Sequence, residues 1–203
     1  MLDILRLPCD IQQVVRSEYR HGLRERMSTI QYHVRTFCVN DTDRMLDWMA
    51  HMLKYPNVKP PQGIVLIGPP GCGKSLFAQL LTLLLGQDKV VYTPTLPRFN
   101  GCLEGATLVH LDECLKPQVH RFISDQTLAI RRPYQDPYNV PSYHRVLVTT
   151  TFMSPLLTHS EAFQQRFTVI PCGVFFKPQD LRAAMDDPVR LASFRQHLME
   201  RQV

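Results

Sequence analysis

The chain has 203 residues, a formal net charge of +5, 44% hydrophobic residues and 20% charged residues. This length suffices for one α/β domain with a core and a small appendage, but not for two full domains. The mild positive charge permits a nucleic-acid partner without requiring one. The longest aliphatic run, at residues 80–85, is far shorter than the roughly 18 residues of a membrane span, so we expect no membrane partner.

The cysteines indicate neither a zinc site nor a disulfide framework. The sequence contains no C-x-x-C pair, no two histidines at zinc-ligand spacing and no charged-then-apolar leader. We therefore expect reduced thiols and a cytoplasmic location. The cysteines are Cys9, Cys38, Cys72, Cys102, Cys114 and Cys172.

Residues 1–56 are predicted to form an N-terminal helical segment. Ile11, Val14, Val15 and Tyr19 recur at helical spacing, which favours one amphipathic helix with a basic face. That face either packs on the rest of the domain or binds DNA.

A further helix is expected from the capping residues at 40–42 to just before Pro56. Its methionines and Trp48 are residues of the kind that fill a core. The paired prolines Pro60 and Pro61 then form a stiff connector to the first strand.

The most specific motif lies at residues 68–75, which fill every fixed position of the phosphate-binding pattern G-x-x-x-x-G-K-[ST]. The apolar residues 64–67 before it predict a buried parallel strand, and residues 76–85 predict the helix that must follow. In such a loop, backbone N–H groups surround a polyphosphate, Lys74 reaches the β- and γ-phosphates, and the Ser75 hydroxyl binds Mg²⁺. The predicted nucleotide-binding residues are Gly68, Pro69, Pro70, Gly71, Cys72, Gly73, Lys74 and Ser75.

Two carboxylates follow a second apolar stretch. Residues 89–93 predict a strand, and the aliphatic run at 106–111 leads directly into Asp112 and Glu113. Ligands of P-loop enzymes collect at the carboxyl ends of parallel strands. Asp112 is therefore the candidate for the acid that binds Mg²⁺, and Glu113 for the general base that activates water. His110, within the strand, is expected to be buried and hydrogen-bonded.

A hairpin is predicted after a short helix between residues 116 and 125. Residues 128–144 indicate a strand, a proline-stiffened turn and a returning strand. Arginines can contact phosphates and tyrosines offer stacking faces, which together suit a loop that binds single-stranded nucleic acid. The alternative is an ordinary surface hairpin whose tyrosines cover the edge of the core. The candidate nucleic-acid residues are Arg131, Arg132, Tyr134 and Tyr138.

The last part of the chain predicts two strands and closing helices. Residues 145–152 form a buried strand ending in threonines, of which Thr150 or Thr151 could sense the γ-phosphate or orient the attacking water. After a short helix at 160–165, Arg166 begins a strand, where it either reaches a neighbouring subunit's nucleotide or is a surface cation. The expected division is 1–56 helical, 57–175 the P-loop core and 176–203 C-terminal helices.

The order of these motifs resembles superfamily 3 helicases, above all the motor domain of phage and large-DNA-virus primase-helicases. The resemblance covers residues 42–175 and includes the local sequences Leu46–Ala50, Arg98–Asn100 and Gln165–Phe167. It implies an α/β P-loop NTPase of the AAA+-like kind. Such a fold is a three-layer sandwich with a central parallel sheet, N-terminal helices and a β-hairpin insertion.

The resemblance also implies a ring, usually a hexamer, that binds ATP with Mg²⁺ between subunits and grips one nucleic-acid strand. The sequence departs from the family at Thr151, where members carry asparagine. A threonine hydroxyl donates one hydrogen bond but lacks the second polar group of an amide. On the family pattern, the residues that bind and hydrolyse ATP are Lys74, Ser75, Asp112 and Glu113, with Arg166 acting in trans and Arg131 or Arg132 in the channel.

Three functions are compatible with the sequence. The first is an ATP-driven DNA helicase in the replication of a virus, phage or plasmid, and the second is an RNA helicase of the small RNA virus kind. The third is a nucleotide-gated binding or assembly module with weak or no hydrolysis. With no primase domain before the motor, we expect a fragment, a stand-alone helicase or one subunit of a split system.

Overall fold

The computed structural model describes residues 28–203 except 96, 114–118, 153–159 and 173–177. The amphipathic helix expected around Ile11 and Tyr19 lies outside the described residues. No helix in the described part is long and apolar enough to cross a bilayer.

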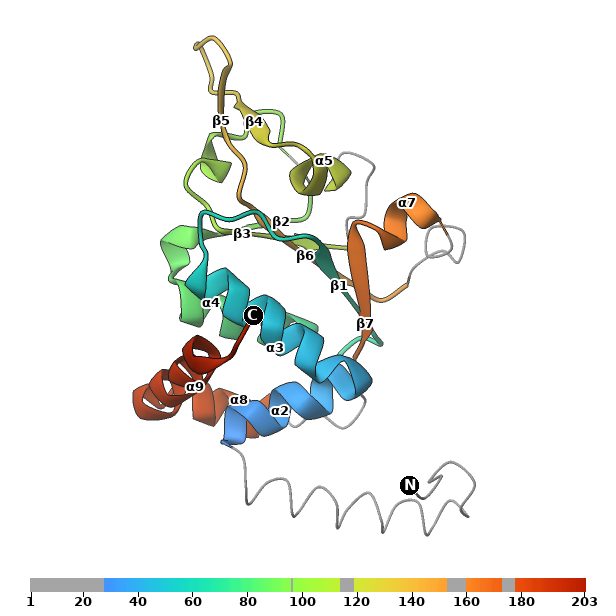
Figure 1. The fold of residues 1–203 in the computed structure, drawn as a ribbon, viewed down its shortest axis with the longest axis vertical. Helices are drawn as coiled ribbons and strands as arrows, with labels where there is room; N and C mark the ends of the chain where they lie inside the picture. Colours follow the sequence, from blue (N-terminus) through green and yellow to red (C-terminus); the bar gives the residue numbers. More distant parts are fainter. Residues whose placement is uncertain (1–27, 96, 114–118, 153–159, 173–177) are drawn as a thin grey trace.

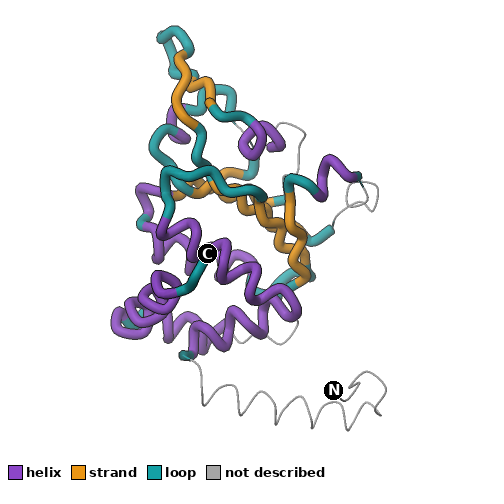
Figure 2. The backbone as a smooth tube through the Cα atoms, viewed as in Figure 1, coloured by secondary structure: helices purple, strands orange, loops and turns teal. Residues whose placement is uncertain are grey.

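A five-stranded parallel sheet forms the centre of the molecule (Figures 1 and 2). All four neighbouring pairs run parallel, so the carboxyl ends of the five strands lie along one edge. This arrangement confirms the predicted α/β fold. In spatial order the strands are β2 (Val90–Thr93), β3 (Leu108–Asp112), β6 (Arg145–Thr150), β1 (Gly63–Ile67) and β7 (Phe167–Pro171).

Helices cover one face of this sheet (Figure 1). Leu66 and Leu147 belong to the core on this face, where Phe37 stacks on Phe77 with ring centroids 5.0 Å apart. The expected core position of Trp48 and the neighbouring methionines is confirmed. The helices are α2 (Thr29–Cys38), α3 (Thr42–Lys54), α4 (Lys74–Leu85), α8 (Pro178–Met185) and α9 (Pro188–Glu200).

The opposite face carries a second, smaller core. Val65, Val109 and Val148 lie there because alternate residues of a strand face opposite sides of the sheet. They belong to one cluster with Phe122 and Phe163. The elements on this side are α5 (Val119–Ser124) and α7 (Glu161–Gln164). Among the described residues, short 3₁₀ turns span Val39–Asp41, Gln87–Lys89 and Gly101–Leu103.

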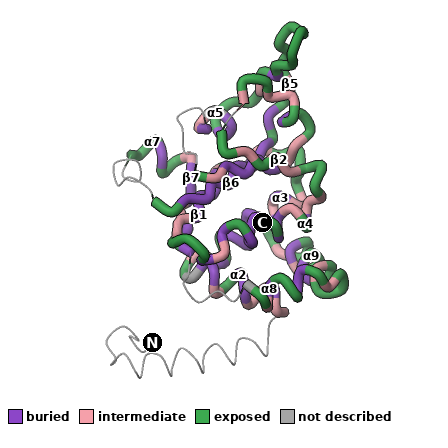
Figure 3. Tube along the Cα trace, turned by 180° about the vertical axis from the view of Figure 1, so that it is seen from behind, coloured by how far each residue is buried: buried purple, intermediate pink, exposed green. Residues whose placement is uncertain are grey.

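The predicted hairpin is present. It consists of β4 (Thr127–Ile130) and β5 (Tyr138–Pro141), which pair antiparallel. The hairpin extends beyond the sheet (Figure 1), and its tip is exposed (Figure 3). Because it leads into the first residue of β6, it lies at the amino ends of the strands, opposite the phosphate loop.

A fully buried arginine joins the start of β6 to the end of α3. The Arg145 guanidinium donates to the carbonyl oxygens of Pro56 at 2.6 Å and Tyr143 at 2.8 Å, and also to that of Tyr55. Carbonyls at a helix C-terminus lack intrahelical partners, so the cation satisfies them. Burial lowers the pKa of Arg145 to about 10.

Candidate functional site

The phosphate loop connects β1 to α4 in the predicted strand–loop–helix order. Gly73, the residue before α4, has φ 105°, a left-handed conformation that residues with a Cβ rarely adopt. Gly68 is needed for a different reason. A Cβ at Gly68 would lie 2.9 Å from both the Cys172 Cβ and the Cys72 Sγ. Cys72 of the loop and Cys172 after β7 therefore both lie against Gly68.

Lys74 lies inside the loop and is only 8% exposed. Its Nζ donates to the carbonyl oxygens of Gly68 at 2.6 Å and Pro69 at 3.1 Å. A buried ammonium requires such partners, so the loop itself satisfies the cation. Ser75, in the first turn of α4, is exposed.

The two predicted acids lie at the carboxyl end of β3: Asp112 is its last residue, and Glu113 follows it. Asp112 accepts from the Thr149 Oγ1 at 2.7 Å, and Glu113 accepts from the Thr150 Oγ1 at 2.8 Å. Glu113 has φ 50°, so the chain turns sharply there and its carboxylate reaches β6. The second oxygen of Glu113 accepts from the backbone N–H of Thr151 at 2.8 Å.

Thr150 connects the phosphate loop to the acids. Its carbonyl oxygen accepts from the Gly68 N–H at 3.2 Å, while its hydroxyl proton is shared between Glu113 Oε2 at 2.8 Å and the Phe152 carbonyl oxygen at 2.7 Å. The strand β6 lies between β1 and β3, so it brings the loop and the carboxylates to one edge of the sheet. Of the two threonines proposed from the sequence, Thr150 contacts Glu113 through its side chain and Thr151 through its backbone.

Two further residues of this site were missed by the sequence reasoning. Tyr92, on β2, donates its hydroxyl to Asp112 at 3.0 Å, and Thr149 contacts both Asp112 and His110. His110 is buried and hydrogen-bonded, as predicted, and burial lowers its pKa. The hydrogen bond to Asp112 raises the pKa of Tyr92. Only the strand order and register could have located Tyr92 beside Asp112.

The donor atoms fit a magnesium ion. Asp112 offers carboxylate oxygens, and Ser75 offers an exposed hydroxyl next to a loop rich in backbone N–H groups. Mg²⁺ prefers hard oxygen ligands and usually binds through one or two protein groups together with phosphates and water. Asp112 and Ser75 would hold it, and the ion would neutralise charge on the phosphates.

The two candidate arginines of the hairpin have different surroundings. The Arg132 guanidinium donates to Glu104 at 2.6 Å, and the Tyr138 hydroxyl donates to the same Glu104 oxygen at 2.6 Å. These hydrogen bonds, with that from Tyr138 the larger cause, lower the pKa of Glu104. Arg131 is exposed, and Tyr134 at the tip is fully exposed with φ 60°. Arg131 and Tyr134 are therefore the more accessible pair.

A loop before β3 joins the hairpin. The Asn100 side chain donates to the Ala129 carbonyl at 2.9 Å and accepts from the Arg131 N–H at 2.7 Å. Phe99 beside it is 50% exposed, and the Arg98 guanidinium lies 5.6 Å from its ring centroid. The sequence singled out this segment only as a local likeness, because a contact across about thirty residues has no local pattern.

Arg166 is half-buried and bonded within its own chain. Its Nε donates to the Ser124 hydroxyl at 2.8 Å, and another guanidinium nitrogen donates to the Ala162 carbonyl at 2.7 Å. A role toward a neighbouring subunit stays a prediction.

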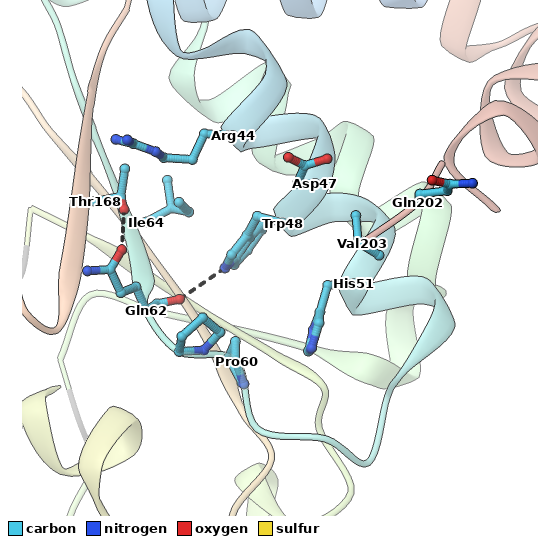
Figure 4. Close-up of a pocket in the computed structure, with 11 residues that line it drawn as sticks. Arg44, Asp47, Trp48, His51, Pro60, Gln62, Ile64, Thr168, Gln202 and Val203 are labelled. Carbon is cyan, nitrogen blue, oxygen red and sulfur yellow. Dashed lines mark hydrogen bonds between the residues drawn. The ribbon is translucent and has the colours of Figure 1, made fainter. Parts of the chain in front are cut away.

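A pocket of about 320 Å³ lies against α3, where β1 and β7 begin (Figure 4). Trp48 donates its Nε1 to the Gln62 carbonyl at 3.2 Å, and the Thr168 hydroxyl donates to the Gln62 side chain at 2.7 Å. Since this pocket is at the opposite end of β1 from the phosphate loop, it is not the nucleotide site.

Sequence comparisons match the region of this site. Residues 66–166 match the model of DUF5906, a family of unknown function. A proteasome-activating nucleotidase from Thermococcus onnurineus is 41% identical over 66 residues, which are 29% of this chain and 16% of that protein. The ATPase histone chaperone YTA7 of Saccharomyces cerevisiae is 25% identical over 164 residues, which are 74% of this chain and 11% of that protein.

Solved structures match more of the chain. The NrS-1 C-terminal region aligns with a TM-score of 0.72 and 18% identity, covering 86% of this chain and 46% of that one. JCV helicase aligns with a TM-score of 0.50 and 13% identity, covering 84% of this chain and 52% of that one. The chain thus spans about half of these structures and far less of the curated relatives.

The curated relatives are named as a nucleotidase and an ATPase, and the solved structures share the fold of this chain. They also agree with the resemblance seen in the motif order. The chain has the fold of a helicase-type P-loop ATPase domain.

Proposed function

We propose that this chain is the motor domain of an ATP-driven helicase that moves on single-stranded DNA as a ring oligomer. The observation that carries the proposal is the position of Thr150. Thr150 contacts the phosphate loop through its carbonyl and Glu113 through its hydroxyl. It is the last residue of β6, and the first residue of β6 is connected to the hairpin.

The phosphate loop supports nucleotide binding. Phosphate oxygens would replace the Gly68 and Pro69 carbonyls as partners of the buried Lys74 ammonium. Asp112 and Ser75 would hold Mg²⁺, which neutralises phosphate charge. Glu113 would accept a proton from the attacking water. Each of its carboxylate oxygens has two lone pairs, so one on each oxygen stays available beside the hydrogen bonds from Thr150 and Thr151.

The hairpin supports strand binding. Arg131 can contact a phosphate and Tyr134 can stack on a base, since both are exposed at or near the tip. The resemblance in motif order makes a ring the expected assembly, with Arg166 near a neighbouring nucleotide. A role in replication of a virus, phage or plasmid follows from the sequence resemblance.

The test measures ATP turnover and strand affinity for the full chain with single-stranded DNA and single-stranded RNA. The double variant Arg131→Ala, Tyr134→Ala should weaken strand binding about tenfold, since stacking alone contributes about 1–3 kcal/mol per base. It should also lower the slope of log affinity against log salt by about one, and leave ATP affinity unchanged. Arg195→Ala, which removes an exposed cation on α9 at the other end of the molecule from the hairpin (Figure 1), is the control.

The outcomes separate the candidate functions. DNA-stimulated turnover supports the proposal, and RNA-stimulated turnover would redirect it to an RNA helicase. ATP binding without turnover would favour a nucleotide-gated binding module. Unchanged strand binding in the double variant would show that the hairpin is not the strand-binding element.

A further inference from the structure

Asp112 is held from both sides by the strands that flank it. Tyr92 lies on β2 and Thr149 on β6, and each binds a different oxygen of the Asp112 carboxylate. We propose that Tyr92 and Thr149 are positioning residues that fix the Asp112 carboxylate in the orientation in which it meets the metal ion. This inference rests on the proposed nucleotide site.

The sheet register explains how these side chains meet. Tyr92 pairs with His110 in the β2–β3 register, and Asp112 pairs with Thr149 in the β3–β6 register. Residues two apart on a strand share a face, so His110 and Asp112 point to the same side as their partners. Three adjacent strands therefore deliver four polar side chains to one patch at the carboxyl edge.

The hydrogen-bond directions in this patch follow from the number of protons. The Thr149 hydroxyl has a single proton, which it gives to the Asp112 Oδ1 at 2.7 Å. Its oxygen must then accept from the His110 Nε2 at 2.9 Å, so that nitrogen carries the imidazole proton. His110 is buried, and the Tyr92 ring lies 5.1 Å from its ring. Thr149 is thus itself held in place.

Two hydrogen bonds on different oxygens stop the carboxylate from rotating about its last bond. We call these two hydrogen bonds, from Tyr92 and from Thr149, the Asp112 clamp. Each carboxylate oxygen keeps a further lone pair, so the clamp leaves acceptor sites for a metal or its water. Partners that orient a metal-binding group typically change metal affinity by about tenfold or more when removed. Tyr92 is 59% exposed, so loss of its hydroxyl should not disturb the core.

The test uses Tyr92→Phe, which removes only the hydroxyl and keeps the ring beside His110. Mn²⁺ binding to the chain with ADP is followed by electron paramagnetic resonance, and ADP binding without metal is followed with a fluorescent analogue in EDTA. Mn²⁺ affinity should fall about tenfold, while metal-free ADP affinity stays unchanged. Tyr143→Phe, at another exposed tyrosine, is the matched control.

A second pair of variants tests the other side of the clamp. Thr149→Val should weaken Mn²⁺ binding as Tyr92→Phe does, and Thr149→Ser, which retains the hydroxyl, should restore it. Unchanged or tighter Mn²⁺ binding in Tyr92→Phe would overturn the positioning role, and tighter binding would identify Tyr92 as a competitor of the metal. A wild-type chain that binds no ADP would overturn the proposed function itself, and this role with it.

Discussion

Threonines at the end of β6 combine two properties that the site needs. Their β-branched side chains suit a buried strand, and their hydroxyls reach the acids of the neighbouring strand. Superfamily 3 helicases, which the motif order resembles, carry asparagine where this chain has Thr151, and an asparagine amide offers two polar groups. Here the Thr150 hydroxyl and the Thr151 N–H each bind one Glu113 oxygen, so side chain and backbone together supply both contacts.

The first prediction concerns Thr150. Thr150→Val keeps the shape of the side chain but removes the hydroxyl that orients Glu113. ATP turnover should fall about tenfold or more, because a hydrogen bond to a charged group is worth about 1.5–3 kcal/mol. ATP affinity should not change, and both are measured by steady-state kinetics and nucleotide titration. Thr168→Val, at a buried threonine of β7, is the control, and equal turnover in both variants would remove Thr150 from the site.

At the scale of elements, the hairpin is not an independent appendage. Asn100 attaches it to the segment before β3, and Glu104 holds both Arg132 and Tyr138. The same segment leads directly into the strand that carries Asp112. A displacement of the hairpin would therefore act on the amino ends of two neighbouring strands, on β3 through residues 100–107 and on β6 through its first residue.

The second prediction tests that attachment. The Arg131 N–H donates to the Asn100 side chain, so Asn100→Ala exposes this amide. Exchange of the Arg131 amide hydrogen, measured by NMR, should become about tenfold faster. A tenfold change in rate corresponds to a loss of roughly 1.4 kcal/mol in the free energy of opening. Asn139→Ala, on the exposed strand β5, should leave it unchanged. Equal exchange in wild type and Asn100→Ala would mean that the loop does not hold the hairpin.

At the scale of the whole molecule, the sequence predicts elements better than contacts. The strands at 63–67 and 108–112 were predictable because both are apolar runs ending in motif residues, and parallel pairing forces their ends to one edge. The contacts of Tyr92 with Asp112, and of Asn100 with the hairpin, were not. They depend on the strand order and on loop closure, which no local spacing encodes.

The third prediction concerns pH. Burial is the main cause that lowers the pKa values of His51, His110, His120 and His144 below 6.5. Below about pH 6.5 the unfolded chain then binds more protons than the folded one, so the free energy of unfolding should fall as the pH decreases. Urea denaturation at pH 7.5 and 5.5 measures the loss.

His144 offers a single-site check of this pH dependence. It is buried, and its Nε2 donates to the Leu103 carbonyl at 2.8 Å, a bond that a glutamine amide can reproduce. His144→Gln should make the loss of stability between pH 7.5 and 5.5 smaller, whereas His197→Gln on α9 is the control. An identical loss in His144→Gln and wild type would contradict the assignment.

The most direct test of the account compares ATP binding and turnover in wild type and Glu113→Gln. Glutamine keeps the size of the side chain but cannot accept the proton of the attacking water. The account predicts unchanged MgATP affinity and a loss of turnover of about a hundredfold or more, as for removal of a general base. Turnover that persists at the wild-type rate in Glu113→Gln would contradict the central claim that this carboxylate performs ATP hydrolysis.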